Sequence, residues 1–118
     1  MSIPNHTIAF IAGVSSADVS NYHAGGRRRE RYVSPAKREA IEKAMAMSQT
    51  DLIVWHFETF HDTLTQAYAG VHYHIGRLSE RVRELNKRWH RTGEKRFITN
   101  TAPLGFGVVA VYKLEEYK

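Results

Sequence analysis

The first 48 residues hold short apolar clusters separated by small and polar residues. The cluster at 8–12 stops at Gly13, a residue suited to the left-handed end of a helix. Val19 and Tyr22 lie three positions apart, which places them on one face of a second helix that the glycines at 25–26 end. The pattern predicts two short helices joined by a tight turn.

A third helix is indicated by Ser34 and Pro35, because serine caps helices and proline is favoured in their first turn. We expect this helix to run to about Ser48. The side chains predicted to face inward are Ala40, Ile41, Ala44 and Met45. Residues 1–48 are therefore expected to form a three-helix head.

From residue 64 to residue 89 the spacing between apolar residues alternates between four and three. This alternation is typical of the seam of a coiled coil or a long helix pair. It predicts one helix over about residues 50–92, and a break near Gly70 that gives two packed helices is the alternative. The seam residues are Leu64, Tyr68, Val71, Ile75, Leu78, Val82, Leu85 and Trp89. Because one helix cannot bury this seam alone, we expect it to form a homodimer.

The remaining residues alternate in the manner of two strands around a turn rich in glycine and proline. They predict a β-hairpin at about residues 96–114. The expected fold class is therefore mainly α, with the head at 1–48 and a dimerisation region at 49–118. In that region a long, coiled-coil-like helix precedes the short hairpin.

Composition narrows the classes of protein that the chain can represent. It has 118 residues, 17 Lys and Arg against 12 Asp and Glu, a formal net charge of +5, and no cysteine. The lack of cysteine excludes disulfide frameworks and cysteine zinc sites. The sequence lacks an apolar run that predicts a membrane span or signal peptide, so we expect a cytoplasmic protein without a membrane partner. The positive charge favours polyanionic partners.

Residues 8–20 have the spacing of a helix-turn-helix motif. Ala9 is small enough to let two helices cross closely, and Gly13 relieves the turn between them. Val14 and Val19 can fill the space between the helices. The second helix would then be free to enter the major groove of DNA.

Residues 7–48 resemble the DNA-binding headpiece of the lactose-repressor family. The resemblance is carried by Ile8-Ala9, Ala12-Gly13-Val14-Ser15, Val19-Ser20, Val33-Ser34-Pro35-Ala36, Arg38-Glu39 and Ile41-Glu42-Lys43-Ala44-Met45. For the base edges of DNA, it implies contacts from Ser16, Ala17 and Asn21. For the phosphates, it implies contacts from Ser15, Ser20 and Ser34.

Two polar residues of the second helix, Asn21 and Asp18, have different expected roles. Asn21 is the clearest base reader, because asparagine can form two hydrogen bonds with adenine. Asp18 would repel phosphate unless it accepts a hydrogen bond from cytosine or caps its own helix, and we expect the cap.

The loop before the third helix departs from the family. It is about four residues longer than the family loop and holds Arg27, Arg28, Arg29 and Arg31, which we expect to contact phosphates. The family's hinge and sugar-binding domain are absent from this sequence. Effector sensing therefore does not carry over from the resemblance.

A second basic stretch, residues 77–96, holds eight basic and three acidic residues. Charged residues normally flank a coiled-coil seam, where they keep it soluble and pair between helices. We interpret the stretch in that way, and an additional nucleic-acid surface is the alternative.

Glu58 and His61 form a Glu-x-x-His motif, which supplies iron ligands in ferritin-like proteins. One copy does not complete such a site, so we predict no metal and no cofactor.

Together, the patterns predict a small sequence-specific DNA-binding transcriptional regulator without enzymatic activity. We expect a repressor of the kind found in phages and mobile elements, which binds double-stranded DNA at a palindromic operator as a homodimer. One alternative is an inhibitor that docks on a host protein through its aromatic C-terminal region. The other is a metal-dependent enzyme that uses Glu58 and His61.

Overall fold

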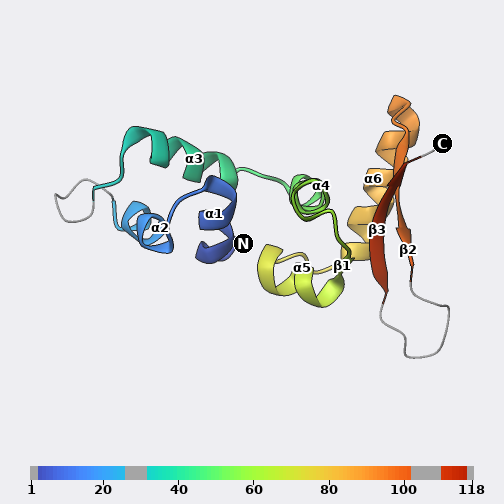
Figure 1. The fold of residues 1–118 in the computed structure, drawn as a ribbon, viewed down its shortest axis with the longest axis horizontal. Helices are drawn as coiled ribbons and strands as arrows, with labels where there is room; N and C mark the ends of the chain where they lie inside the picture. Colours follow the sequence, from blue (N-terminus) through green and yellow to red (C-terminus); the bar gives the residue numbers. More distant parts are fainter. Residues whose placement is uncertain (1–2, 26–31, 102–109, 117–118) are drawn as a thin grey trace. The chain divides into compact units, whose positions relative to one another are not determined.

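The structure of the chain is a computed structural model that describes residues 3–25, 32–101 and 110–116 (Figure 1). The chain folds as two compact units, Met1–Met47 and Ser48–Lys118, here called unit 1 and unit 2. The described part of unit 1 contains helices and no strand, whereas unit 2 combines helices with a small antiparallel sheet. The predicted mainly helical class is confirmed.

Unit 1 consists of three helices around one small core. The helices are α1 (Asn5–Ala12), α2 (Ser16–His23) and α3 (Pro35–Met45). Each helix contacts the other two. The buried core residues are Ile8, Ala9, Val19, Val33, Ile41 and Ala44. All three helices therefore contribute apolar side chains to the same interior.

The third helix begins where the sequence predicts. The Ser34 hydroxyl accepts a hydrogen bond from the Lys37 backbone N–H at 3.3 Å, and Pro35 is the first helical residue. The helix ends at Met45, three residues before the expected end. The inward position predicted for Met45 is wrong, because 38% of its surface is exposed. Met45 is the last residue of α3, and Ala44 before it is buried.

The single helix predicted over about residues 50–92 is wrong. Unit 2 instead contains α4 (Gln49–Phe60), α5 (Gln66–Tyr73) and α6 (Leu78–Thr92). His61 and His74 have φ angles of 50° and 53°, and these left-handed conformations end α4 and α5. The alternative break near Gly70 is also wrong, since Gly70 lies inside α5.

No helix in the described residues is long and apolar enough to cross a membrane.

Most of the predicted seam is buried within unit 2. On α6, one face buries Leu78, Val82, Leu85 and Trp89. Leu64 is buried in strand β1 (Leu64–Thr65), and Ile75 is buried in the loop between α5 and α6. Tyr68 and Val71 are exceptions, with 38% and 63% of their surface exposed. Burial of the other six seam residues therefore requires no second copy of the chain.

The sheet of unit 2 has the strand order β1-β3-β2 and is antiparallel throughout. Strand β2 (Arg96–Asn100) pairs with β3 (Val111–Glu116), and Ile98 lies opposite Leu114. This pair corresponds to the predicted hairpin, although β3 begins at Val111 and extends beyond the expected end near residue 114. The short β1, which the sequence did not predict, pairs with β3 through Leu64 and Tyr112.

Two side-chain amides hold the elements of unit 2 together. The Asn86 amide on α6 donates to the Ile98 carbonyl at 2.8 Å and accepts from the Ile98 N–H at 2.7 Å. The Gln66 amide donates to the Ile75 carbonyl and accepts from the Leu78 N–H, both at 2.7 Å. Asn86 therefore attaches α6 to strand β2, and Gln66 orders the turn that leads into α6.

Candidate nucleic-acid interface

Helix α2 exposes four of its eight side chains and buries one. Of its eight residues, only Val19 is buried. Ser16, Ala17 and Ser20 are exposed, and Asn21 is half-buried. The polar side chains of Ser16, Ser20 and Asn21 form no hydrogen bond with other described residues. They are therefore available to a ligand.

The turn before α2 sets its direction relative to α1. Gly13 has a φ angle of 72°, the left-handed conformation that the sequence led us to expect. The next residue, Val14, donates its backbone N–H to the Ala9 carbonyl at 3.0 Å and packs against the core of unit 1. The polar face of α2 is thus presented by a short, internally bonded turn.

The first turn of α2 is closed by a reciprocal cap. The Ser15 hydroxyl accepts from the Asp18 N–H, and the Asp18 carboxylate accepts from the Ser15 N–H, each at 3.1 Å. Lys37 of α3 donates to the same carboxylate at 3.2 Å. The Ser15 N–H and Lys37 hold the pKa of Asp18 below its usual value. The expected cap is confirmed, and the paired Asp18 charge is weakened as a source of repulsion for phosphate.

The end of α2 is also attached to α3. The Tyr22 hydroxyl donates to the Glu42 carboxylate at 3.2 Å. The Arg38 guanidinium lies 5.4 Å from the centre of the Tyr22 ring and donates to the Gly25 carbonyl at 3.4 Å. Both ends of α2 are therefore held by α3, which limits the motion of the polar face between them.

The two capping serines keep a hydrogen-bond donor for a ligand. Ser15 and Ser34 each accept a backbone N–H at a helix start, and each hydroxyl retains its own hydrogen to donate. Ser15, Ser16, Ala17, Ser20 and Asn21 come together on or next to α2, while Ser34 begins α3. The residues expected to contact phosphate from the loop, Arg27, Arg28, Arg29 and Arg31, lie outside the described residues.

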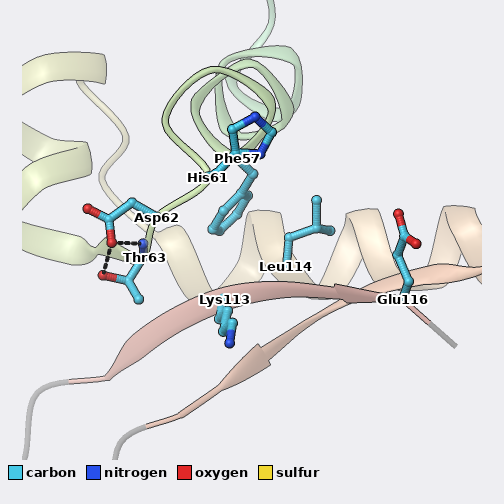
Figure 2. Close-up of a pocket in the computed structure, with 7 residues that line it drawn as sticks. All are labelled: Phe57, His61, Asp62, Thr63, Lys113, Leu114 and Glu116. Carbon is cyan, nitrogen blue, oxygen red and sulfur yellow. Dashed lines mark hydrogen bonds between the residues drawn. The ribbon is translucent and has the colours of Figure 1, made fainter. Parts of the chain in front are cut away.

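A hollow of about 490 Å³ lies in unit 2 between the end of α4 and strand β3 (Figure 2). Figure 2 shows the lining residues Phe57, His61, Asp62, Thr63, Lys113, Leu114 and Glu116. The Asp62 carboxylate accepts from the Thr63 backbone N–H at 2.7 Å. No hydrogen bond between described residues joins two of the four ionisable side chains in this lining.

Glu58 and His61 lie in different local surroundings. The Glu58 carboxylate accepts from the Arg96 guanidinium at 3.1 Å, and His61 lies at the left-handed end of α4. The described residues contain no group of three or more histidine, aspartate or glutamate side chains that could hold a metal ion. The Glu-x-x-His pair thus gains no additional ligand from the described fold.

His56 is a buried polar residue of α4, with 3% of its surface exposed. Its Nε2–H donates to the Thr63 carbonyl at 2.9 Å, and its Nδ1 accepts from the Tyr73 hydroxyl at 2.6 Å. Burial lowers the pKa of His56 and raises the pKa of Tyr73. The apolar positions Leu52, Ile53 and Phe57 place His56 on the buried face of α4, which is the signal that could have located it.

No protein-family model matches the chain, and comparisons with curated proteins and with solved structures give no match, so the geometry of the chain itself has to support any function.

Proposed function

We propose that the chain is a sequence-specific DNA-binding transcriptional regulator that represses by covering a promoter. The exposed polar face of α2 carries this proposal. Ser16, Ala17 and Ser20 are exposed beside Asn21, while Val19 anchors the helix. A helix with short polar side chains can approach base edges in the major groove, where asparagine pairs with adenine.

The arrangement around α2 supports the interpretation of unit 1 as a helix-turn-helix domain. A three-residue turn separates α1 from α2, and α3 holds both ends of α2 through Lys37 and Glu42. The hydroxyls of Ser15 and Ser34 can donate to phosphate while they cap their helices. Under this proposal, the serines position unit 1 on the DNA backbone and Asn21 contributes sequence discrimination.

The proposal includes a homodimer at a palindromic operator. The seam residues that remain accessible to a second copy are Tyr68 and Val71, three positions apart on α5. Phe60, at the end of α4, is 39% exposed and also apolar. Under this proposal the dimer contact forms around these side chains. The contact would present two copies of α2 to half-sites about one helical turn apart, or a multiple of it.

Selection of DNA from a random pool tests the proposal directly. The full chain is incubated with 20–30 base-pair random duplexes (about two to three turns of DNA), and bound fragments are sequenced after several rounds. We expect two inverted copies of one short sequence, spaced by about 10 base pairs or a multiple. If no sequence is enriched, the proposed specificity is wrong. If one unpaired half-site is enriched, the homodimer is wrong.

The exposed apolar side chains also favour a second candidate function, docking on a host protein through the aromatic region of unit 2. Phe60, Tyr68 and Val71 are exposed, as either a dimer contact or a host-protein contact requires. Sedimentation of the purified chain separates the two. A dimer that Val71→Asp dissociates supports the regulator, whereas a monomer that shows no DNA sequence preference supports the docking function.

A further inference from the structure

The outer face of α6 carries exposed cations that have no acidic partner. We call Arg83, Lys87, Arg88 and Arg91, with Lys95 just beyond the helix, the cationic face of α6. None of these five side chains forms an ion pair with another described residue. In contrast, Arg77, Arg81 and Arg96 each pair with a glutamate. The unpaired cations are therefore concentrated on one part of unit 2.

Packing of α6 within unit 2 does not require these cations. The helix buries Leu78, Val82, Leu85 and Trp89 on one face, and Lys87 and Arg91 project from the opposite face at 100° per residue. The sequence favoured a role for such residues in pairing across a coiled coil. Because the apolar face of α6 is buried within its own unit, that face is not available for pairing with a second helix of a coiled coil.

The spacing of the cations creates repulsion within the helix. Arg83, Lys87 and Arg91 follow one another at intervals of four residues, and like charges at this spacing destabilise a helix. Only Arg91 lies in the last turn, where the helix dipole favours a positive charge. A bound polyanion would remove this repulsion.

The geometry of the cationic face suits a nucleic-acid backbone. From Arg83 to Arg91 the helix rises by about 12 Å, which matches three or four base-pair steps along the axis of a duplex. A shallow hollow on this face is lined by Glu84, Lys87, Arg88, His90 and Arg91. Glu84 is paired with Arg81 at 3.1 Å, so its charge is partly neutralised. The hollow therefore presents mainly positive charge to an approaching phosphate.

We propose that the cationic face of α6 binds the phosphate backbone of double-stranded DNA independently of sequence. The choice of duplex DNA as the polyanion rests on the function proposed for α2, whereas the cationic face itself does not. The two surfaces would have different effects. Contacts of α2 would select a sequence, and contacts of α6 would raise affinity for every duplex.

The test compares two full-chain variants with the same net charge. Lys87→Gln/Arg91→Gln removes two unpaired cations, and Arg77→Gln/Arg81→Gln removes two paired ones. The Kd for a duplex of unrelated sequence is measured between about 50 and 200 mM salt, a range over which phosphate contacts dominate the response. Circular dichroism melts verify that both variants remain folded.

We expect the Lys87→Gln/Arg91→Gln variant to lower the slope of log K against log salt by about 1.8, because each lost phosphate contact contributes about 0.9. The Arg77→Gln/Arg81→Gln variant should leave the slope unchanged. Equal slopes in both variants would overturn the proposal. It would also be overturned if phosphatidylserine vesicles distinguished the two variants and DNA did not, since the surface would then bind a membrane.

The same measurements separate this inference from the function proposed for α2. If random-pool selection enriches no sequence but the slopes of the two variants differ, the cationic face binds DNA and the regulator function is wrong. If a sequence is enriched and the slopes are equal, the regulator function stands and the inference about α6 is wrong.

Discussion

Helices α2 and α6 expose opposite kinds of polar surface. Helix α2 buries only Val19 and exposes short, uncharged side chains such as Ser16 and Ser20. Helix α6 buries a full face of large apolar residues and exposes unpaired cations, including Lys87 and Arg91. Short hydrogen-bonding groups can distinguish bases, whereas long cations attract phosphate at every sequence. Under the two proposals, sequence specificity and general affinity for DNA would reside in different units of the chain.

The difference also concerns stability. Helix α2 is held through caps and side-chain contacts with α3, such as the Tyr22–Glu42 hydrogen bond. Helix α6 is held by four buried apolar residues and by Asn86, whose amide binds strand β2. Substitutions on the exposed faces should therefore change binding, whereas substitutions on the buried face of α6 should change folding.

The largest expected effect comes from Leu78→Asp. Leu78 is fully buried within unit 2, so the substitution leaves a space in the core and places a charge there. We expect the free energy of unfolding of unit 2 to fall by at least about 3 kcal/mol. Both tryptophans, Trp55 and Trp89, lie in unit 2, so their fluorescence during urea unfolding measures this loss.

Val71→Asp provides the matched control for Leu78→Asp. Val71 is 63% exposed in the single chain, so at chain concentrations too low for a dimer the same charge should change the free energy of unfolding by no more than about 0.5 kcal/mol. If Leu78→Asp changes the free energy of unfolding as little as Val71→Asp, the buried face of α6 does not contribute to the core of unit 2. The two variants therefore separate a folding role of the seam from a dimer role.

Asn21→Ala should have an intermediate effect, and on binding alone. Loss of the amide should cost about 1–3 kcal/mol at one base position of the selected operator and relax discrimination there. The measurement is a set of Kd values for operators that differ at single positions. Lys87→Gln/Arg91→Gln is the informative comparison, because it should weaken binding to all of these duplexes alike. A uniform loss with Asn21→Ala would contradict base reading by α2.

The smallest expected effect is a pH dependence of the stability of unit 2. Burial lowers the pKa of His56 from its usual value of 6.5, so the unfolded chain binds a proton more readily than the folded chain. The stability of unit 2 should therefore be complete above pH 6.5, fall as the pH drops below 6.5, and level off below the folded pKa. Thermal melts followed by tryptophan fluorescence at pH 7.5 and pH 5 (values on either side of the ordinary histidine pKa of about 6.5) measure the fall.

His56→Gln should remove most of this pH dependence. An unchanged pH dependence in His56→Gln would assign the effect to another group in unit 2.

Local signals in the sequence predicted the start of α3, the turn before α2 and the exposed face of α2. Ser34 and Pro35 predicted the start of α3, and Gly13 predicted the turn before α2. Asp18 was correctly expected to cap its helix, since a cap involves residues only three positions apart. These features depend on neighbours along the chain, which the sequence contains directly.

The breaks between α4, α5 and α6 could not be predicted in the same way. His61 and His74 adopt left-handed conformations although neither is a glycine, so their residue type did not predict the helix ends. The apolar spacing continues across these breaks because Leu64, Ile75 and Leu78 are all buried in unit 2 although they lie in different local structures. A pattern that suggested one long seam thus arises from several short elements.

The sequence by itself determined the mainly helical class, the caps that start α2 and α3, the net charge and the polar face of α2. The tertiary structure decided which apolar residues are buried together, that His56 is enclosed by Thr63 and Tyr73, and which cations of α6 lack a partner. Periodicity specifies which residues share a face of an element. The partner of that face depends on where the chain reverses, and here two isolated left-handed residues place α6 against its own unit.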